Sequence, residues 1–591
     1  MNPGTRQVLS GIAASPGVAV GTVCLFVRGH IYVPRRYIAR DQLAAEEERL
    51  QRAIEASRDE LETIGQRIGA ATEHRLLLDA QLLMHRDELL IHGAIELLRE
   101  RCINAEWALS QVTSRIAERM RGASEAYFRE RAGDIENVGE RILHKLVGGT
   151  VELPQVNEGS VIVADDLGPA DAALLLRSTA RGIAIDLGSA SSHTAILARA
   201  LEIPAVVGVR QLSRLVADDD VIIVDAFRGE IVLWPSEEEQ LSARARGSRY
   251  RAFTRSLRGR VARSLQSADG TAIRLAANVE LPAEAAVALQ EGATGIGLYR
   301  TEFLYLDRAV PPGEEEQAKI YRDVTQVLSP RPVVFRTFDI GGDNLHGCDP
   351  SSELMNPALG LRALRLGLAT PALLNTQLRA MLRASDAGDV RIMFPLVSSV
   401  EELRHARALL REAQRELLAE GFALGRVLVG CMIEVPSAVI MADALARECD
   451  FFSVGTNDLV QYAMAVDRTN PNVAHLASPL HPAVLRLLDM TGKAARNANI
   501  GLGICGGMAA DPLALPMLLG LGFEELSVDV GYLPLARAII ERIDLPLATR
   551  TAEDALRCVT TEEVKSLIIE RFKGPLGDIW VEQGFEPAAH S

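Results

Sequence analysis

The spacing of hydrophobic and polar residues changes several times along the chain and predicts a different kind of element in each part. Residues 1–24 hold short apolar runs broken by glycine and proline, which predicts strands that pair with a later segment, because so short a piece cannot fold alone. Within residues 25–147, apolar residues recur at helical spacing from about residue 38, which predicts an inserted helical bundle. Residues 148–235 return to short strands and predict a small α/β domain together with residues 1–24. The later helices of the insert are expected at about 75–85, 87–100, 105–121 and 124–147.

The remaining part of the chain predicts a connector followed by a barrel. Residues 236–265 are rich in arginine and lack strong apolar periodicity, which predicts a solvated connector helix that lets two domains swing. From about residue 270 onward, strand-like runs alternate with helices, and we count eight runs: AIRLAAN, TGIGLY, PVVFRT, VRIMFPL, VLVGCMIE, FFSVG, IGLGIC and ELSV. Eight βα units over residues 266–591 match the count that a (β/α)8 barrel requires. The predicted fold class is therefore multidomain α/β, with an α/β domain, an inserted helical bundle and a C-terminal (β/α)8 barrel.

Composition narrows the classes of function. The 591 residues carry a net charge of −15, which argues against wholesale binding to nucleic acid or to an anionic membrane. The longest apolar run, around Leu513 to Phe523, is too short to span a bilayer, and the first residues lack the pattern of a secretory signal. Seven scattered cysteines form neither a disulfide framework nor a zinc-binding spacing. We therefore expect a cytoplasmic protein without membrane insertion.

Polar residues follow the predicted barrel strands at their C-terminal ends, where barrel enzymes place their active sites. Three arginines in this set suit an anion with several oxygens, because guanidinium groups bind phosphate and carboxylate in a bidentate way. Two of the carboxylates in the set, Glu434 and Asp458, would repel each other unless they shared a divalent cation such as Mg²⁺. A single arginine of this kind is more often part of a surface ion pair, but the whole set favours a binding site. The residues are Arg300, Arg336, Asp339, Glu434, Asn457, Asp458 and Arg468.

Two further residues are candidates for chemistry. Cys505 follows the seventh predicted strand, where it is either a buried packing residue or a proton donor to an enolate at the pocket mouth. His193 opens a helix after the run IAIDLGSASS. Phosphate on its ring would be stabilised by free backbone N–H groups and the positive end of the helix dipole. A histidine at such a position, taken alone, is more often a cap or a surface residue.

Long motifs in the same order resemble Enzyme I of the bacterial phosphoenolpyruvate:sugar phosphotransferase system. They are SGIAASPGVAVG, SSHTAILARALEIPAVVG, GIGLYRTEFL, FRTFDIGGD, NPALGLRALR, LLNTQLRAMLRAS, FFSVGTNDLVQYAMAVDR and GICGG. The resemblance covers nearly the whole chain. It implies a swivelling phosphohistidine domain that accepts phosphoryl from phosphoenolpyruvate and passes it to a histidine phosphocarrier protein, in the first step of sugar uptake.

The resemblance also implies a role for each site residue. His193 would be phosphorylated, and Cys505 would protonate the enolate as pyruvate forms. The substrate would be held by Arg300, Arg336, Asn457 and Arg468, and Mg²⁺ by Glu434 and Asp458. The helical insert would dock the carrier, and the barrel would form a homodimer. The chain departs from the usual pattern at Asn344, where the family has lysine, at Gly507, where it has glutamate, and in the GSASSH run before His193.

Two related enzymes and a scaffold are the alternatives. A phosphoenolpyruvate synthase or pyruvate phosphate dikinase shares the phosphohistidine domain and the barrel, but its ATP-binding domain finds no room in the 192 residues before His193. A regulatory, nitrogen-type phosphotransferase normally carries an additional N-terminal sensory domain. A docking scaffold without catalysis would not need the residues at the strand ends. The sequence names neither the sugars nor the carrier.

Overall fold

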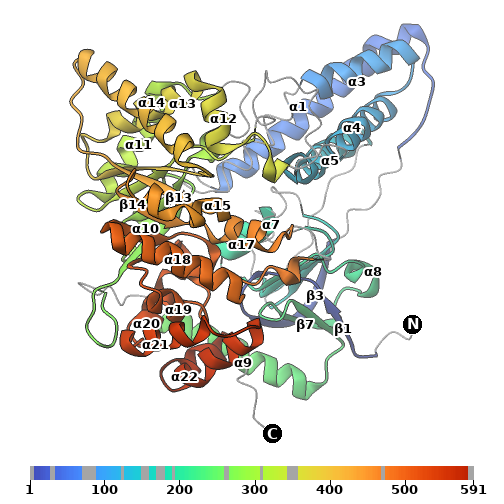
Figure 1. Ribbon diagram of the computed structural model, residues 1–591. Coiled ribbons are helices and arrows are strands. Elements are labelled where there is room, and N and C mark those ends of the chain that lie inside the picture. Colours follow the sequence, from blue (N-terminus) through green and yellow to red (C-terminus); the bar gives the residue numbers. More distant parts are fainter. Residues whose placement is uncertain are drawn as a thin grey trace. The chain divides into compact units, whose positions relative to one another are not determined.

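The chain divides into two compact units, residues 1–253 and 254–591, which are described separately (Figure 1). The computed structural model describes residues 5–26, 33–68, 85, 88–121, 126–147, 157, 159–167, 180–188, 193–201, 203–257, 265–305, 311–341, 357–467 and 473–583. The predicted multidomain α/β class is confirmed. The finer boundaries at residues 24, 147, 235 and 265 stay predictions.

The first unit is built on an eight-stranded sheet in the order β1-β8-β7-β3-β4-β5-β6-β2. Strand β3 holds its middle, because it pairs antiparallel with β7 on one side and parallel with β4 on the other. The opening strands thus pair with later segments, as their length required. The strands are β1 (Gln7–Ser10), β2 (Ile12–Ser15), β3 (Val18–Phe26), β4 (Val161–Ala164), β5 (Gly182–Ile185), β6 (Ala205–Val207), β7 (Val221–Asp225) and β8 (Glu230–Leu233). Helices α7 (His193–Ala200) and α8 (Leu212–Leu215) accompany the sheet.

Four helices of the insert share an apolar core. They are α1 (Leu43–Ile68), α3 (Glu88–Arg101), α4 (Ala105–Arg121) and α5 (Ala126–Val147). Leu50, Leu98 and Val138 are fully buried between them, as helical spacing of apolar residues predicts. Leu61 of α1 instead packs with Ile162 in the core of the sheet. The stretch expected at about 75–85 lies outside the described residues apart from His85.

The predicted connector is helical over α9 (Glu237–Leu257). One face of α9 is not solvated, because Ala243 packs against Val18 and Ile223 of the sheet. Arg246 also donates to the buried carboxylate of Asp225 at 2.8 Å. The expectation of a fully solvated connector is therefore wrong for the first half of this helix.

The second unit contains a closed barrel of eight parallel strands, in which β16 pairs with β9. All eight predicted runs form strands, and the predicted barrel is confirmed. The strands are β9 (Arg274–Val279), β10 (Ile296–Arg300), β11 (Val333–Arg336), β12 (Val390–Phe394), β13 (Leu428–Ile433), β14 (Phe451–Val454), β15 (Gly501–Ile504) and β16 (Glu525–Asp529).

Helices surround the barrel and include amphipathic segments whose apolar faces are buried. Helix α14 begins with a capping box, in which the Ser399 hydroxyl accepts from the Glu402 N–H at 3.2 Å. The α-helices are α10 (Glu284–Gln290), α11 (Glu314–Leu328), α12 (Ala363–Ala369), α13 (Pro371–Ala384), α14 (Val400–Ala419), α15 (Pro436–Ile440), α16 (Ala442–Leu445), α17 (Thr456–Met464), α18 (Pro482–Ala498), α19 (Leu515–Gly520), α20 (Leu533–Ile540), α21 (Leu545–Ala555) and α22 (Thr561–Glu582). No helix within the described ranges is long and apolar enough to cross a membrane.

Candidate active site

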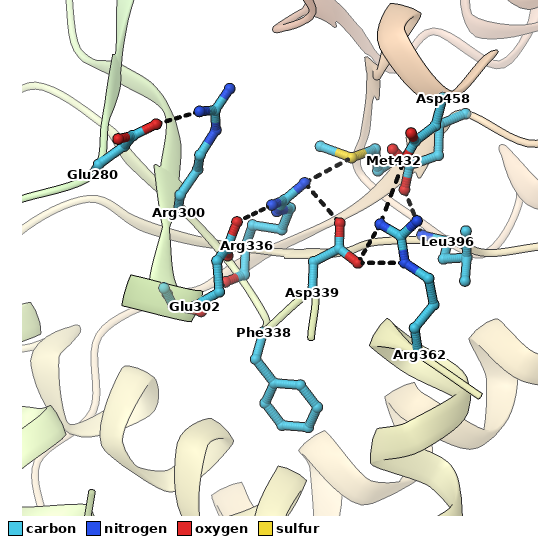
Figure 2. A network of polar contacts seen from close by, with 12 residues as sticks. Glu280, Arg300, Glu302, Arg336, Phe338, Asp339, Arg362, Leu396, Met432 and Asp458 are labelled. Atoms are coloured by element: carbon cyan, nitrogen blue, oxygen red, sulfur yellow. Dashed lines mark hydrogen bonds and ion pairs between the residues drawn. The ribbon is translucent and has the colours of Figure 1, made fainter. Parts of the chain in front are cut away.

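Alternating charges form a row across the C-terminal ends of the barrel strands (Figure 2). Arg336, the last residue of β11, pairs with Glu302 through Nη2, and its Nη1 lies 3.2 Å from Oδ2 of Asp339. Asp339 accepts from Nη2 of Arg362 at 2.8 Å. Nη2 of Arg362 lies 3.4 Å from Oδ2 of Asp458, in the first turn of α17. We call these five residues, Glu302, Arg336, Asp339, Arg362 and Asp458, the charged row.

Two members of the charged row, Arg336 and Asp339, are kept charged by their neighbours although both are buried. Burial alone would lower the pKa of Arg336, but the charges of Glu302 and Asp339 outweigh it and raise that pKa. Burial would likewise raise the pKa of Asp339, but Arg336 and Arg362 hold it below its ordinary value. The charges of Arg336 and Asp339 therefore stabilise each other.

One donor of Arg336 has no partner among the residues that the structure describes. Nε of Arg336 is buried and makes no hydrogen bond to the described residues, and the same holds for Oε2 of Glu302. Only 9% of Arg336 is exposed. A buried donor without a partner costs about 1–3 kcal/mol, so an oxygen acceptor beside this Nε would stabilise the site.

Arg300 ends strand β10 next to the row and pairs with Glu280 (Figure 2). About 30% of its side chain is exposed, so it is more accessible than Arg336. Two guanidinium groups from neighbouring strand ends therefore lie at the same end of the barrel.

Glu434 directly follows strand β13 and is 2% exposed. Its Oε1 accepts from the backbone N–H of Leu396 at 2.6 Å, and Leu396 holds the left-handed backbone conformation (φ 52°) that this loop requires. Burial first, and then the charges of Asp458 and Asp339, raise the pKa of Glu434 to about 8. Within the described ranges, no group of three or more histidine, cysteine or acidic side chains is arranged to hold a metal ion by itself.

Cys505 follows strand β15 and is 3% exposed. Burial is the main reason that the pKa of its thiol rises to about 11, so the thiol carries its proton at neutral pH. Asn278 donates to the carbonyl of Cys505 at 3.2 Å, and Ser527 donates to the amide oxygen of Asn278 at 2.7 Å. These contacts fix the backbone of Cys505 from the ends of β9 and β16.

The loop after Cys505 is fastened to the start of α17. Asn457 accepts from the N–H of Gly507 at 3.2 Å, and Thr456 accepts from the N–H of Met508 at 3.4 Å. The loop that bears the thiol and the helix turn that bears Asp458 are thus held as one piece.

Two predicted site residues, His193 and Arg468, are not among the side chains that the structure describes at the barrel. His193 is the first residue of α7 in the first unit, as expected, while its side chain lies outside the description. Thr194, beside it, is buried and donates to the carbonyl of Leu167 at 3.4 Å. Arg468 lies outside the described residues, as does Asn344.

Three family descriptions match successive parts of the chain. They are "PEP-utilising enzyme, N-terminal" over residues 10–131, "PEP-utilising enzyme, mobile domain" over 156–229 and "PEP-utilising enzyme, PEP-binding domain" over 256–545. A phosphoenolpyruvate-protein phosphotransferase of Geobacillus stearothermophilus is 40% identical over 571 residues, which cover 96% of this chain and 98% of that protein. The chain belongs to the phosphoenolpyruvate-protein phosphotransferase family.

A protein of the same name from Staphylococcus aureus is 38% identical over 568 residues, or 95% of this chain and 99% of that protein. A solution structure described as Enzyme I is 32% identical, with a TM-score of 0.36, and covers 41% of this chain and 99% of that chain. End-to-end matches to phosphotransferases of this family do not favour the synthase, dikinase or regulatory alternatives.

Sequence reasoning assigned no role to Arg362, which the structure places in the charged row of this family member. It precedes α12 and reaches the row because Gly341 and Arg362 form an isolated β-bridge. The motif NPALGLRALR contains it, but it follows no predicted strand. A search restricted to strand ends could not find it.

The two adjacent glycines after Cys505 give a matched test of the loop packing. A Cβ on Gly506 would lie 1.9 Å from Oγ1 and 2.5 Å from the backbone nitrogen of Thr456, whereas a Cβ on Gly507 would meet only Oδ1 of Asn457 at 3.2 Å. We expect Gly506→Ala to destabilise the protein by about 1–3 kcal/mol and Gly507→Ala by less than about 0.5 kcal/mol. Thermal unfolding, with hydrogen exchange at residues 456–458 as the local readout, distinguishes them. Equal effects of the two substitutions would show that this packing is not tight.

Proposed function

We propose that this chain is a phosphoenolpyruvate-protein phosphotransferase. In this proposal it takes phosphoryl from phosphoenolpyruvate onto His193, releases pyruvate, and passes the phosphoryl group to a histidine phosphocarrier protein as the first step of sugar uptake. The observation that supports it best is the buried Arg336, whose Nε has no partner among the described residues, in a barrel matched as PEP-binding. A compact anion is the ligand that such a donor fits.

Arg300 and Arg336 are proposed to hold the substrate together with Asn457 and Arg468. Arg336 is fixed by Glu302 and Asp339, so it offers Nε without first losing side-chain freedom. Arg300 is partly exposed and would exchange part of its contact with Glu280 for substrate oxygens. Asn457 and Arg468 stand in this set by resemblance.

Glu434 and Asp458 are proposed to hold Mg²⁺. Burial first, and then the negative charges of Asp458 and Asp339, raise the pKa of Glu434, and a hard divalent cation with oxygen ligands would fit this donor pair. Two protein carboxylates are too few for a complete shell, so substrate oxygens would supply further ligands. When bound, the cation would neutralise charge on the phosphoryl group and on the enolate.

The proposed reaction needs one nucleophile and one acid. A ring nitrogen of neutral His193 forms the P–N bond as the P–O bond of phosphoenolpyruvate breaks, and the enolate of pyruvate leaves. The Cys505 thiol then gives its proton to the methylene carbon of the enolate, which completes pyruvate, and the thiolate regains a proton from solvent. A thiol with its pKa raised to about 11 is protonated at neutral pH, as this role requires.

The partners rest on the resemblance. The insert, residues 25–147, is proposed to dock the carrier, and the barrel to form a homodimer in the cytoplasm. In favour of the dimer, the barrel exposes Ile440 at the end of α15, Met441 directly after it, and Met490 on α18; helix α18 contacts both short helices. Whether the carrier serves sugar uptake or a regulatory branch is decided by transfer to each candidate carrier.

Intact mass measurement tests the function. After incubation with phosphoenolpyruvate and Mg²⁺, the protein should gain the mass of one phosphoryl group, and acid should remove it. His193→Ala should show no gain while it still binds phosphoenolpyruvate in calorimetry. No gain in the native protein, or the same gain in His193→Ala, would contradict the proposal.

Metal binding should depend on pH because Glu434 must lose its proton to become a ligand. With a pKa of about 8, Glu434 is mainly protonated at pH 6.5, so cation affinity should rise up to about tenfold per pH unit towards pH 8 and then level off. Free Mn²⁺, a spectroscopic substitute for Mg²⁺, can be titrated by electron paramagnetic resonance without substrate. Glu434→Gln should bind weakly at every pH. Constant affinity of the native protein from pH 6.5 to 8.5 would be inconsistent with Glu434 as a ligand.

A further inference from the structure

Gln377 is a fully buried amide that connects the loops following two barrel strands. It lies on α13, and its Oε1 accepts from the backbone N–H of Phe338 at 2.9 Å. Its Nε2 donates to the Thr301 hydroxyl at 2.9 Å. Thr301 in turn donates to the carbonyl of Arg336 at 2.8 Å. The Gln377 side chain thus bonds directly to Thr301, the residue after Arg300, and to the N–H of Phe338. Through Thr301 it is also linked to the carbonyl of Arg336, the last residue of β11.

The orientation of this amide is determined by its neighbours. A backbone N–H can only donate, so the atom that faces Phe338 must be Oε1, and Nε2 must face Thr301. Nε2 also donates to the Tyr321 hydroxyl at 3.3 Å. That hydroxyl is free to accept, because its own proton goes to Gln317 at 3.0 Å.

Gln317 continues this hydrogen-bond network beyond Tyr321. Its Nε2 donates to the carbonyl of Pro312 at 2.7 Å, so its Oε1 faces the ring hydroxyls. Tyr305 and Tyr321 both donate to that oxygen, at 3.1 and 3.0 Å. The donor and the acceptor of each hydrogen bond in the network are therefore fixed. Such an arrangement favours a single geometry, because a rotated amide would set donors against donors.

The residues that Gln377 joins flank the proposed substrate site. Arg300 immediately precedes Thr301, and Phe338 lies between Arg336 and Asp339 in the chain. A shift of the β11 end of about 1 Å would move Arg336 relative to Arg300, and small misplacements of this kind can lower rates by about 100-fold. An apolar side chain of the same size would fill the space but would leave the Phe338 N–H buried without a partner.

We propose that Gln377 is a positioning residue that sets the distance between Arg300 and Arg336 through Thr301 and Phe338. This inference rests on the proposed function. Gln377 does not contact either arginine side chain, so its effect passes through the backbone of the two strand ends.

Three variants of the full chain test the assignment. Gln377→Met removes both hydrogen-bonding functions at similar volume, and Thr301→Val removes the link to the Arg336 carbonyl while leaving the amide in place. Thr491→Val is the matched control, because the equally buried Thr491 donates to a helix carbonyl at 3.0 Å on α18 and contacts neither strand end. Each variant is assayed for phosphohistidine formation from phosphoenolpyruvate, for KM and kcat separately, and for thermal unfolding.

We expect Gln377→Met to lower kcat/KM at least tenfold, whereas the kcat/KM of Thr491→Val stays within twofold of native. Gln377→Met should also unfold at a lower temperature than Thr491→Val, because it leaves the Phe338 N–H buried without a partner. Thr301→Val should also lose several-fold, and the double variant Gln377→Met/Thr301→Val should lose little more than Gln377→Met alone, since both act on one link. A purely structural role would give Gln377→Met the kinetics of Thr491→Val, which would overturn the inference while the native protein stays active. If Gln377→Met does not fold, native kinetics of Thr301→Val would overturn it instead. Failure of the native protein to form phosphohistidine would overturn the proposed function itself.

Discussion

The buried ion pair between Arg336 and Asp339 is the interaction on which the barrel mouth depends. A guanidinium that is 9% exposed at a strand end is too costly to leave unpaired, and removing one partner of such a pair typically costs about 3–5 kcal/mol. Asp339 does not pair with Arg336 only, because it also pairs with Arg362. Arg362 in turn pairs with Asp458. The charged row is therefore a cooperative unit rather than a set of separate ion pairs.

The same unit explains how the site accommodates opposite charges. Nε of Arg336 makes no hydrogen bond to any described residue, and in the proposed function an anion would bind on that side of the row. At the other end, burial first, and then the charges of Asp458 and Asp339, raise the pKa of Glu434. Binding an anion beside Arg336 and a cation beside Glu434 would relieve both imbalances. This pairing is the physical reason for proposing that phosphoenolpyruvate and Mg²⁺ bind together.

Much of this arrangement could be predicted from the sequence because it follows strand ends. The eight apolar runs identified the barrel, and their last residues led to Arg300, Arg336, Glu434 and Cys505, which the structure places at the same end of it. The roles of Arg362 and Gln377 could not be predicted from the sequence. A loop brings Arg362 to the strand ends and a surrounding helix brings Gln377 there, through tertiary contacts that leave no local sequence pattern. The packed face of α9 was missed for a related reason: small residues such as Ala243 give little periodic signal although they allow close contact. The roles of His193 and Arg468 stay predictions from the resemblance.

The most direct test of the account is whether the guanidinium of Arg336, rather than its charge alone, binds the substrate. In the full chain with Mg²⁺, phosphoenolpyruvate binding can be measured by calorimetry for the native protein and for Arg336→Lys, which keeps the charge but lacks Nε and the planar fork. The account predicts that the variant binds about 10–100-fold more weakly, the loss expected for one charge-assisted hydrogen bond. Affinity within twofold of native would contradict it.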